Sequence, residues 1–152
     1  MQAWVLPRQD GDLSQLSWAR WLAEHGVEET IFCYHASPPL WNRVPMGELP
    51  SMRAFADSMR AALPEAGRLG IKLWSCGIPE CVLKDSEAPR VESRRLFDET
   101  LRTDGAPAAC SRARRKAKAF PAACRGCRAQ ALCEGVWKGY LENRGEEEFS
   151  AI

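Results

Sequence analysis

Three cysteines near the carboxyl end of the chain have a spacing that suits a metal ion or an iron–sulfur cluster. Cys124, Cys127 and Cys133 follow the pattern Cys-x2-Cys-x5-Cys. The tight turn of a Cys-x2-Cys pair brings two thiolates to one centre, and Gly126 within it tolerates a positive φ. Thiolate sulfur selects zinc or an iron–sulfur cluster. The segment therefore predicts a metal or cluster site, with the third thiolate at the start of a helix.

Two simpler interpretations of these cysteines are weaker. Buried apolar thiols are common singly, but they rarely come as a triplet within ten residues. A disulfide framework fits poorly because the chain has seven cysteines, an odd number, and no signal-peptide pattern after Met1. Metal or cluster binding is therefore the favoured interpretation.

The residues around the cysteines resemble a known family. Residues 120–152 read Phe-Pro-x2-Cys-x2-Cys-x5-Cys-x-Gly-Val-x3-Tyr-Leu-x3-Gly-x2-Glu up to residue 148. This run resembles the C-terminal auxiliary iron–sulfur segment of radical S-adenosylmethionine enzymes of the SPASM/twitch type, in which an upstream cysteine completes the ligands of a four-iron–four-sulfur (4Fe-4S) cluster. The stretch Gly77-Ile78-Pro79-Glu80-Cys81 is similar to that upstream element. The ligand set that the resemblance implies is Cys81, Cys124, Cys127 and Cys133.

Two other cysteines are alternates for the fourth ligand. Cys76 follows an expected strand, and Cys110 lies among small residues before a basic run; the resemblance favours Cys81. The larger SPASM pattern has one more cysteine four residues after the third, where this chain has Trp137. The resemblance therefore implies one cluster rather than two. Cys33 lies in an apolar run and is expected to be a buried thiol.

The chain departs from the family in its catalytic part. The sequence contains no Cys-x3-Cys-x2-Cys motif, which in the family holds the catalytic cluster and binds S-adenosylmethionine. The glycine-rich strand ends that contact the cofactor are absent as well, because Tyr34 is followed by His35-Ala-Ser-Pro-Pro. A lone histidine such as His35 is more often structural than catalytic. No catalytic residue is therefore predicted, and S-adenosylmethionine would be used only through a partner.

The first half of the chain alternates strands and helices. Apolar runs at residues 3–6, 30–34 and 71–75 predict strands. Helical spacing of apolar residues predicts one helix between Asp12 and Gly26 and another capped by Ser51, which Pro64 would kink or end. The order strand–helix–strand–helix–strand with short connections predicts a parallel sheet with right-handed crossovers.

These elements define the expected fold class. We expect an α/β protein in which a partial parallel (β/α) half-barrel, residues 1–80, precedes a small Cys-rich metal- or cluster-binding domain, residues 81–152. Val136, Trp137, Tyr140 and Leu141 predict one face of a closing helix that Gly145 ends. An incomplete parallel sheet would leave an open edge at the first strand, where self-association or a protein partner could dock.

Composition limits the partners and the compartment. Lys and Arg number 21 and Asp and Glu 20, and a net charge of +1 argues against nucleic acid as partner. The basic run 111–118 is expected to be a solvated loop or to balance the negative charge of a thiolate-bound cluster. No apolar run approaches the ~20 residues of a membrane span, and reduced thiols point to the cytoplasm. The expected function is iron–sulfur binding; the alternative is a zinc-stabilised four-cysteine module that contacts a protein or nucleic-acid partner.

Overall fold

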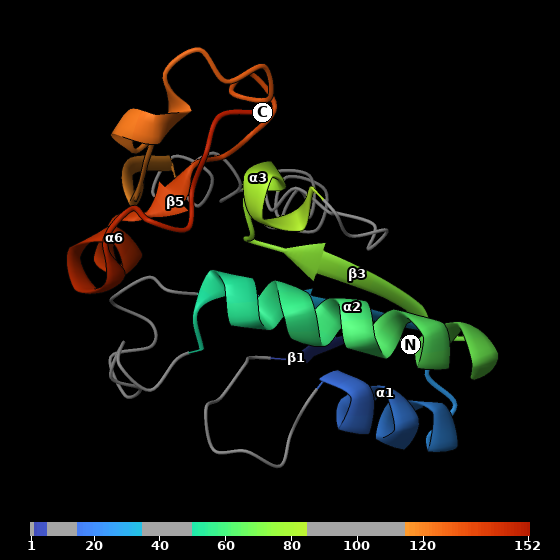
Figure 1. The fold of residues 1–152 in the computed structure, drawn as a ribbon. Coiled ribbons are helices and arrows are strands. Elements are labelled where there is room, and N and C mark those ends of the chain that lie inside the picture. Colours follow the sequence, from blue (N-terminus) through green and yellow to red (C-terminus); the bar gives the residue numbers. More distant parts are fainter. Residues whose placement is uncertain (1, 6–14, 35–49, 85–114) are drawn as a thin grey trace, which may run out of the picture.

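The computed structural model describes residues 2–5, 15–34, 50–84 and 115–152 of the chain, which has 152 residues. His35, Cys110 and Asp12, where the first helix was predicted to begin, lie outside these residues. The elements, shown in Figure 1, are β1 (Gln2–Val5), α1 (Gln15–Glu24), β2 (Glu29–Cys33), α2 (Met52–Arg68), β3 (Lys72–Cys76), α3 (Glu80–Leu83), β4 (Lys118–Ala119), the 3-10 turn η2 (Ala122–Cys124), β5 (Val136–Trp137) and α6 (Lys138–Arg144).

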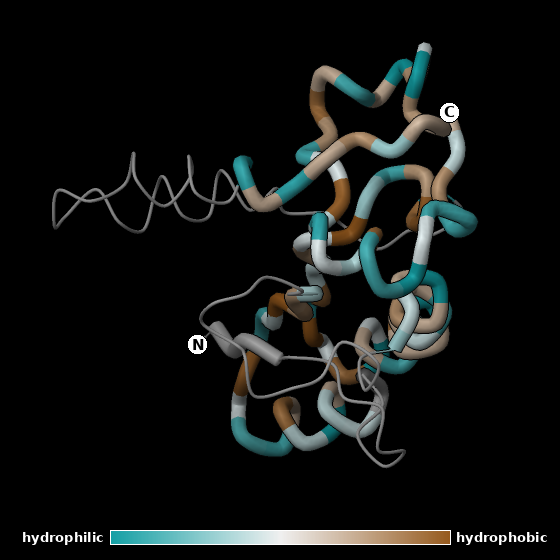
Figure 2. Tube along the Cα trace, turned by 90° about the vertical axis from the view of Figure 1, so that its left-hand side faces the viewer, coloured by the Kyte–Doolittle hydropathy of each residue, from teal (hydrophilic) through white to brown (hydrophobic). Residues whose placement is uncertain are grey.

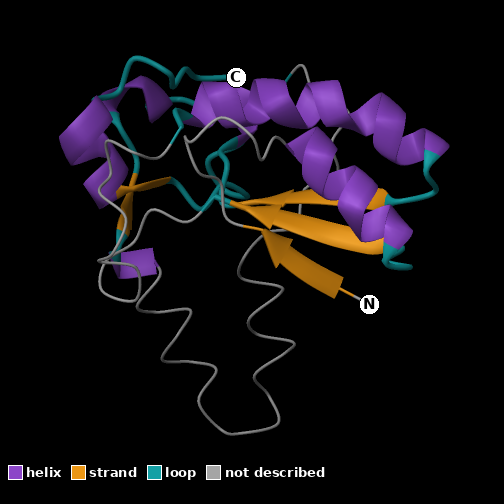
Figure 3. Cartoon of the chain, turned by 90° about the horizontal axis from the view of Figure 1, so that it is seen from below, coloured by secondary structure: helices purple, strands orange, loops and turns teal. Residues whose placement is uncertain are grey.

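The first three strands form a sheet in the order β1-β2-β3, and both neighbouring pairs are parallel. Helices α1 and α2 lie side by side on one face of this sheet (Figure 3). The predicted α/β class with parallel strands is therefore confirmed. Three parallel strands with helices on one face are common to many α/β folds, so the half-barrel stays a prediction. Among the described strands, β1 and β3 form the two edges of the sheet.

Strand β2 is apolar on both of its faces, as the central strand of this sheet should be. Phe32, and Tyr34 directly after the strand, pack into the main core with α1 and α2, whereas Ile31 and Cys33 belong to a small cluster on the opposite face. All four side chains are buried. The alternation places every second residue of β2 under the helices, and hydrophilic residues lie mainly on the outer turns (Figure 2).

Helix α2 begins at the predicted cap, and it continues past Pro64, where the sequence had left open an end or a kink. Ser51 is the N-cap, and its Oγ accepts a hydrogen bond from the amide of Ala54 at 3.0 Å. Pro64 does not end the helix, which continues to Arg68. The proline removes one helical hydrogen bond, but Ala66 beyond it is fully buried against the sheet, and this packing holds the last turn in place.

The C-terminal part packs onto the end of the sheet through three aromatic residues. The indole nitrogen of Trp137 donates to the carbonyl of Tyr34 at 3.3 Å, and the amide of Met52 donates to the hydroxyl of Tyr140 at 3.0 Å. The rings of Tyr34 and Tyr140 meet edge to face at 5.9 Å. One apolar core therefore continues across the expected boundary between residues 80 and 81.

The closing helix is shorter than predicted. Val136 and Trp137 form β5, which pairs antiparallel with β4, so only Tyr140 and Leu141 lie in α6. Pairing with a distant strand overrides the helical spacing of these residues. Gly145 ends α6 with a φ of 74°, as predicted. Among the helices of the described residues, none is long and apolar enough to cross a bilayer.

Candidate metal centre

A tight turn after β3 positions Cys81. Gly77 has a φ of +80°, and a Cβ on it would lie 2.3 Å from the carbonyl oxygen of Tyr34. Only glycine fits here, because a side chain would strain the backbone and displace a backbone atom of the neighbouring strand. Helix α3 follows at once, and its Val82 and Leu83 are buried in the core. The thiol of Cys81 is thereby held at the carboxyl end of the sheet, toward the C-terminal part of the chain.

Cys124 and Cys127 lie in the tight turn that their spacing predicts. The amide of Cys124 donates to the carbonyl of Pro121 at 2.9 Å, and the amide of Cys127 donates to the carbonyl of Cys124 at 3.1 Å. Gly126 between them has a φ of +77°, as expected. A carboxylate oxygen of Glu146 accepts from the amide of Ala122 at 3.0 Å and so ties the start of this turn to the C-terminal segment.

Cys133 is held by a turn, whereas the sequence predicted that it would start a helix. Its amide donates to the carbonyl of Ala129 at 2.8 Å, and α6 begins only at Lys138. Gly135 follows with a φ of +80°, where a Cβ would lie 2.7 Å from the carbonyl oxygen of Ala119. The amide of Gly135 donates to the sulfur of Cys133 at 3.4 Å. The chain must return to pair with β4 at this point, so no helix can begin.

The hairpin of β4 and β5 closes the cysteine segment at its base. Lys118 on β4 forms an ion pair with Glu134, and its ammonium lies 4.6 Å from the ring centroid of Trp137. The side chain of Lys118 is only 3% exposed, whereas Arg115 and Lys116 are exposed. The burial of Lys118 therefore differs from the solvent exposure that a solvated loop over residues 111–118 would give it. A lysine in such a run carries no sequence signal of burial, so pattern reasoning missed this ion pair.

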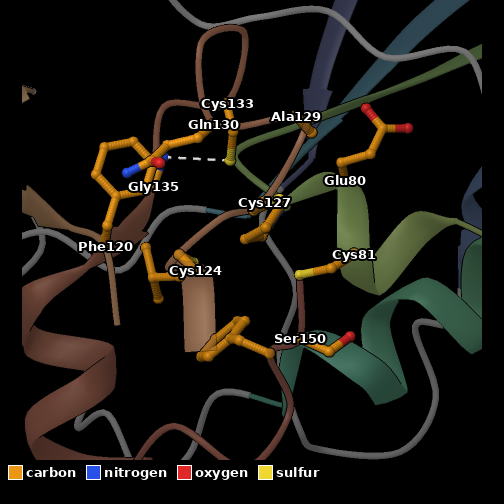
Figure 4. Close-up of a pocket in the computed structure, with 13 residues that line it drawn as sticks. Glu80, Cys81, Phe120, Cys124, Cys127, Ala129, Gln130, Cys133, Gly135 and Ser150 are labelled. Carbon is orange, nitrogen blue, oxygen red and sulfur yellow. Dashed lines mark hydrogen bonds between the residues drawn. The ribbon is translucent and has the colours of Figure 1, made fainter. Parts of the chain in front are cut away.

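All four cysteines of the implied ligand set line one pocket, although Cys81 precedes Cys124 by more than forty residues. Figure 4 shows them arranged around a common space, with Cys81 approaching from α3 and the other three from the loops of the C-terminal part. The remaining walls come from Pro79, Glu80, Phe120, Ala129, Gln130, Gly135, Val136, Phe149 and Ser150.

The electrostatics of this pocket disfavour a set of bare thiolates. Burial raises the pKa of the Cys124 thiol, and the neighbouring Cys81, Cys133 and Cys127 raise it further, as does Glu146. The Cys124 thiol becomes harder to ionise when groups beside it carry negative charge. A cation at the centre would reverse this effect, because thiolate ligands are stabilised by the metal that they bind.

The donor chemistry fits a thiophilic centre. Four thiols around one pocket are the ligands of both structural zinc and 4Fe-4S clusters. Zinc requires ligand sulfurs within ~4 Å of one another, whereas a cubane places them roughly 6–7 Å apart. Among the described residues, no group of three or more His, Cys, Asp or Glu side chains has the arrangement that a single metal ion needs.

The other cysteine candidates lie elsewhere. Cys76 is buried with Cys33 on the sheet face opposite α1 and α2, and it does not line the pocket of the other four. The expectation that Cys33 is a buried thiol is confirmed. Cys110, the second alternate, lies outside the described residues.

Comparison of the chain with protein-family models, with curated proteins and with solved structures gives no match. The resemblance to radical S-adenosylmethionine enzymes therefore rests on the cysteine spacing and the residues around it. What that resemblance implies about function is carried forward below as a proposal.

Proposed function

We propose that this chain is an iron–sulfur protein whose 4Fe-4S cluster is held by Cys81, Cys124, Cys127 and Cys133. The observation that supports this proposal best is the position of Cys81, which lines the same pocket as three thiols from a distant segment. A second observation is the amide of Gly135, which donates to the sulfur of Cys133. Hydrogen bonds to ligand sulfurs tune such clusters. When bound, the cluster would supply one-electron transfer or an anchor for substrate.

We further propose that the chain corresponds to the C-terminal part of a radical S-adenosylmethionine protein. In this proposal residues 1–80 are the last part of the (β/α) barrel, and residues 81–152 are a SPASM/twitch-like auxiliary domain. The order of parallel strands and helices followed by a cysteine on α3 supports it. Because the catalytic motif is missing, the chain would either need a partner that carries the catalytic cluster or represent a truncated or split form.

The partner or a second copy would dock at β1, which is an edge strand among the described strands and lies where the missing part of a barrel would continue. Such a protein would work in a reducing compartment such as the cytoplasm, since thiols there stay available as ligands. Size-exclusion chromatography with light scattering tests self-association directly. A chain that stays monomeric at high concentration would exclude docking of a second copy and leave docking of a different protein.

Anaerobic reconstitution with iron and sulfide tests the cluster. We expect a brown protein with broad absorption near ~400 nm and about four iron and four sulfide per chain. The variants Cys81→Ser, Cys124→Ser, Cys127→Ser and Cys133→Ser should each lose most of the iron. Cys76→Ala is the matched control, because Cys76 is buried away from the pocket, and it should keep full iron content. Iron loss in Cys76→Ala but not in Cys81→Ser would contradict the ligand assignment.

The alternative is a structural zinc site built from the same four thiols. It is supported by the Cys124–Cys127 turn, which brings two thiols together in the way structural zinc sites use. The isolated protein would then be colourless, hold one zinc per chain and lose its fold on chelation. The module would serve to contact a partner, which the near-neutral net charge makes a protein rather than a nucleic acid.

The chain alone is expected not to cleave S-adenosylmethionine. Cleavage requires an iron with an open coordination site, and four cysteine ligands leave none. Reduced, reconstituted protein mixed with S-adenosylmethionine should therefore form no 5′-deoxyadenosine above a no-protein control. Product that disappears in Cys124→Ala would overturn this expectation and make these cysteines a catalytic cluster.

A further inference from the structure

Residues 146–152, named the strap here, form one wall of the four-cysteine pocket. Phe149 and Ser150 line the pocket, whose other walls come from α3 and from the segment that carries the three clustered cysteines. Figure 4 shows Ser150 on the side of the pocket where Cys81 and Cys124 lie. The strap therefore closes the pocket on the side of these two thiols.

The strap is tied to the cysteine segment near both of its ends. At its start, a carboxylate oxygen of Glu146 accepts a hydrogen bond from the amide of Ala122 at 3.0 Å. At its end, the backbone oxygen of Ile152 accepts from the amide of Arg128 at 2.9 Å. Figure 1 shows this last part of the chain, in red, running beside the orange loops that precede β5. The two hydrogen bonds bracket the turn of Cys124 and Cys127, so the strap and the ligand turn hold each other in place.

The middle of the strap is held more firmly than its start. Phe149 is 5% exposed, and its ring meets that of Tyr140 edge to face at 6.0 Å. The hydroxyl of Tyr140 also donates to the carboxylate of Glu148. Glu146, in contrast, is exposed and directly follows Gly145, which has a φ of 74° at the end of α6. A hydrogen bond at an exposed position competes with water, so the strap should open first at Glu146.

We propose that the strap is a gate on the four-cysteine pocket, which opens by release of Glu146 and so controls entry and loss of the bound metal or cluster. This inference rests on the proposed function, in which the four cysteines hold such a group. A closed strap keeps water and chelators from the side of Cys81 and Cys124, whereas an open strap exposes both thiols to an incoming group. Solvent exposure is among the features that set the potential of an iron–sulfur cluster.

Hydrogen exchange at single-amide resolution tests whether the strap opens as one unit. Glu146→Ala removes the acceptor of the Ala122 amide. The amides of both Ala122 and Arg128 should then exchange at least about fivefold faster, the effect of one lost hydrogen bond, although the acceptor of Arg128 is unchanged. Glu147→Ala, at the exposed glutamate next in the chain, is the matched control and should change neither amide. Faster exchange at Ala122 alone would overturn the proposal, and so would an Arg128 amide that is unprotected in the wild type.

The rate at which a chelator removes iron from the reconstituted protein tests the gate itself. Glu146→Ala should lose iron at least about fivefold faster than the wild type. Glu146→Gln should lose it at the wild-type rate, because the amide oxygen of glutamine can still accept from Ala122. This variant also removes the negative charge beside Cys124, so it separates the hydrogen bond from the charge. Equal, fast loss from both variants would assign the effect to the charge and overturn the gate.

The iron content before chelation separates this inference from the proposed function. A wild-type chain that takes up neither iron nor zinc would contradict the proposed function and, with it, a gate for such a group. A loaded chain in which Glu146→Ala, Glu146→Gln and the wild type lose iron at one rate would leave the proposed function intact and overturn the gate alone.

Discussion

The glycine at the turn between β3 and α3 should be the least replaceable glycine in the described part of the chain. Gly77→Ala adds a Cβ at a φ of +80° and 2.3 Å from the carbonyl oxygen of Tyr34. The left-handed backbone alone costs an alanine roughly 1–2 kcal/mol. The carbonyl must also move. It belongs to the backbone directly after the central strand β2, and it accepts the indole hydrogen bond of Trp137. Together we expect a loss of about 3–4 kcal/mol in the free energy of unfolding.

Two other glycines separate these contributions. Gly126 has a similar φ of +77°, but a Cβ there meets nothing within 4 Å, so Gly126→Ala should cost only the roughly 1–2 kcal/mol of backbone strain. Gly67 lies exposed within α2, without a positive φ and with open space around its Cα. Gly67→Ala should therefore stabilise the protein by about 0.5–1 kcal/mol.

Urea unfolding followed by tryptophan fluorescence measures all three variants. With an m-value of about 1.5 kcal/mol per molar urea, a loss of 3 kcal/mol lowers the midpoint by about 2 M. The order of midpoints should be Gly67→Ala, wild type, Gly126→Ala and Gly77→Ala. A Gly77→Ala midpoint equal to that of Gly126→Ala would show that the close approach to Tyr34 is absent in solution, and with it the turn that positions Cys81.

Three further predictions concern the base of the hairpin, the aromatic contact and the cysteine turn. Glu134→Leu leaves the buried Lys118 without its partner and should cost about 3–5 kcal/mol, most of which the double variant Lys118→Met/Glu134→Leu recovers; a double-mutant cycle by urea unfolding that shows no recovery would contradict the buried pair. Burial raises the pKa of the Tyr34 hydroxyl, so this group keeps its proton more tightly in the folded than in the unfolded protein. Its contribution to the free energy of unfolding is therefore complete below pH ~10 and falls as the pH rises further. The urea midpoint should therefore drop between pH 8 and pH 10.5, and drop less in Tyr34→Phe; equal drops would remove Tyr34 as the cause. Compared with the loaded wild-type protein, Cys127→Ser should show weaker hydrogen-exchange protection in β4, β5 and α6 and unchanged protection in β2 and β3, because ligand binding supplies folding free energy to the C-terminal part; unchanged protection in β4, β5 and α6 would show that this part folds without its ligand.

Local patterns in the sequence determined much of the fold. The tight turn at Cys124 and Cys127 follows from residue spacing and from Gly126, and the cap at Ser51 follows from the hydroxyl that bonds the amide of Ala54. Likewise, short connections between alternating strands and helices left a parallel sheet as the natural arrangement. The turn and the cap depend on neighbours within a few residues, which can be read from the order of residue types, and the parallel pairing follows from the order of the strands and helices along the chain.

Long-range packing decided the rest. Helical spacing around Val136 and Trp137 predicted a helix, but pairing with β4 made these residues a strand. The resemblance implied Cys81 as the fourth ligand and left Cys76 as an alternate. The folded chain separates the two, with Cys81 at the pocket and Cys76 beside Cys33, because these thiols, five residues apart, lie on opposite sides of the turn at Gly77. Which side chains meet across the molecule depends on how the sheet, α3 and the hairpin pack together. That packing is driven by the burial of apolar side chains. Because this driving force is non-directional, the residue types alone do not show which distant segments will pack together.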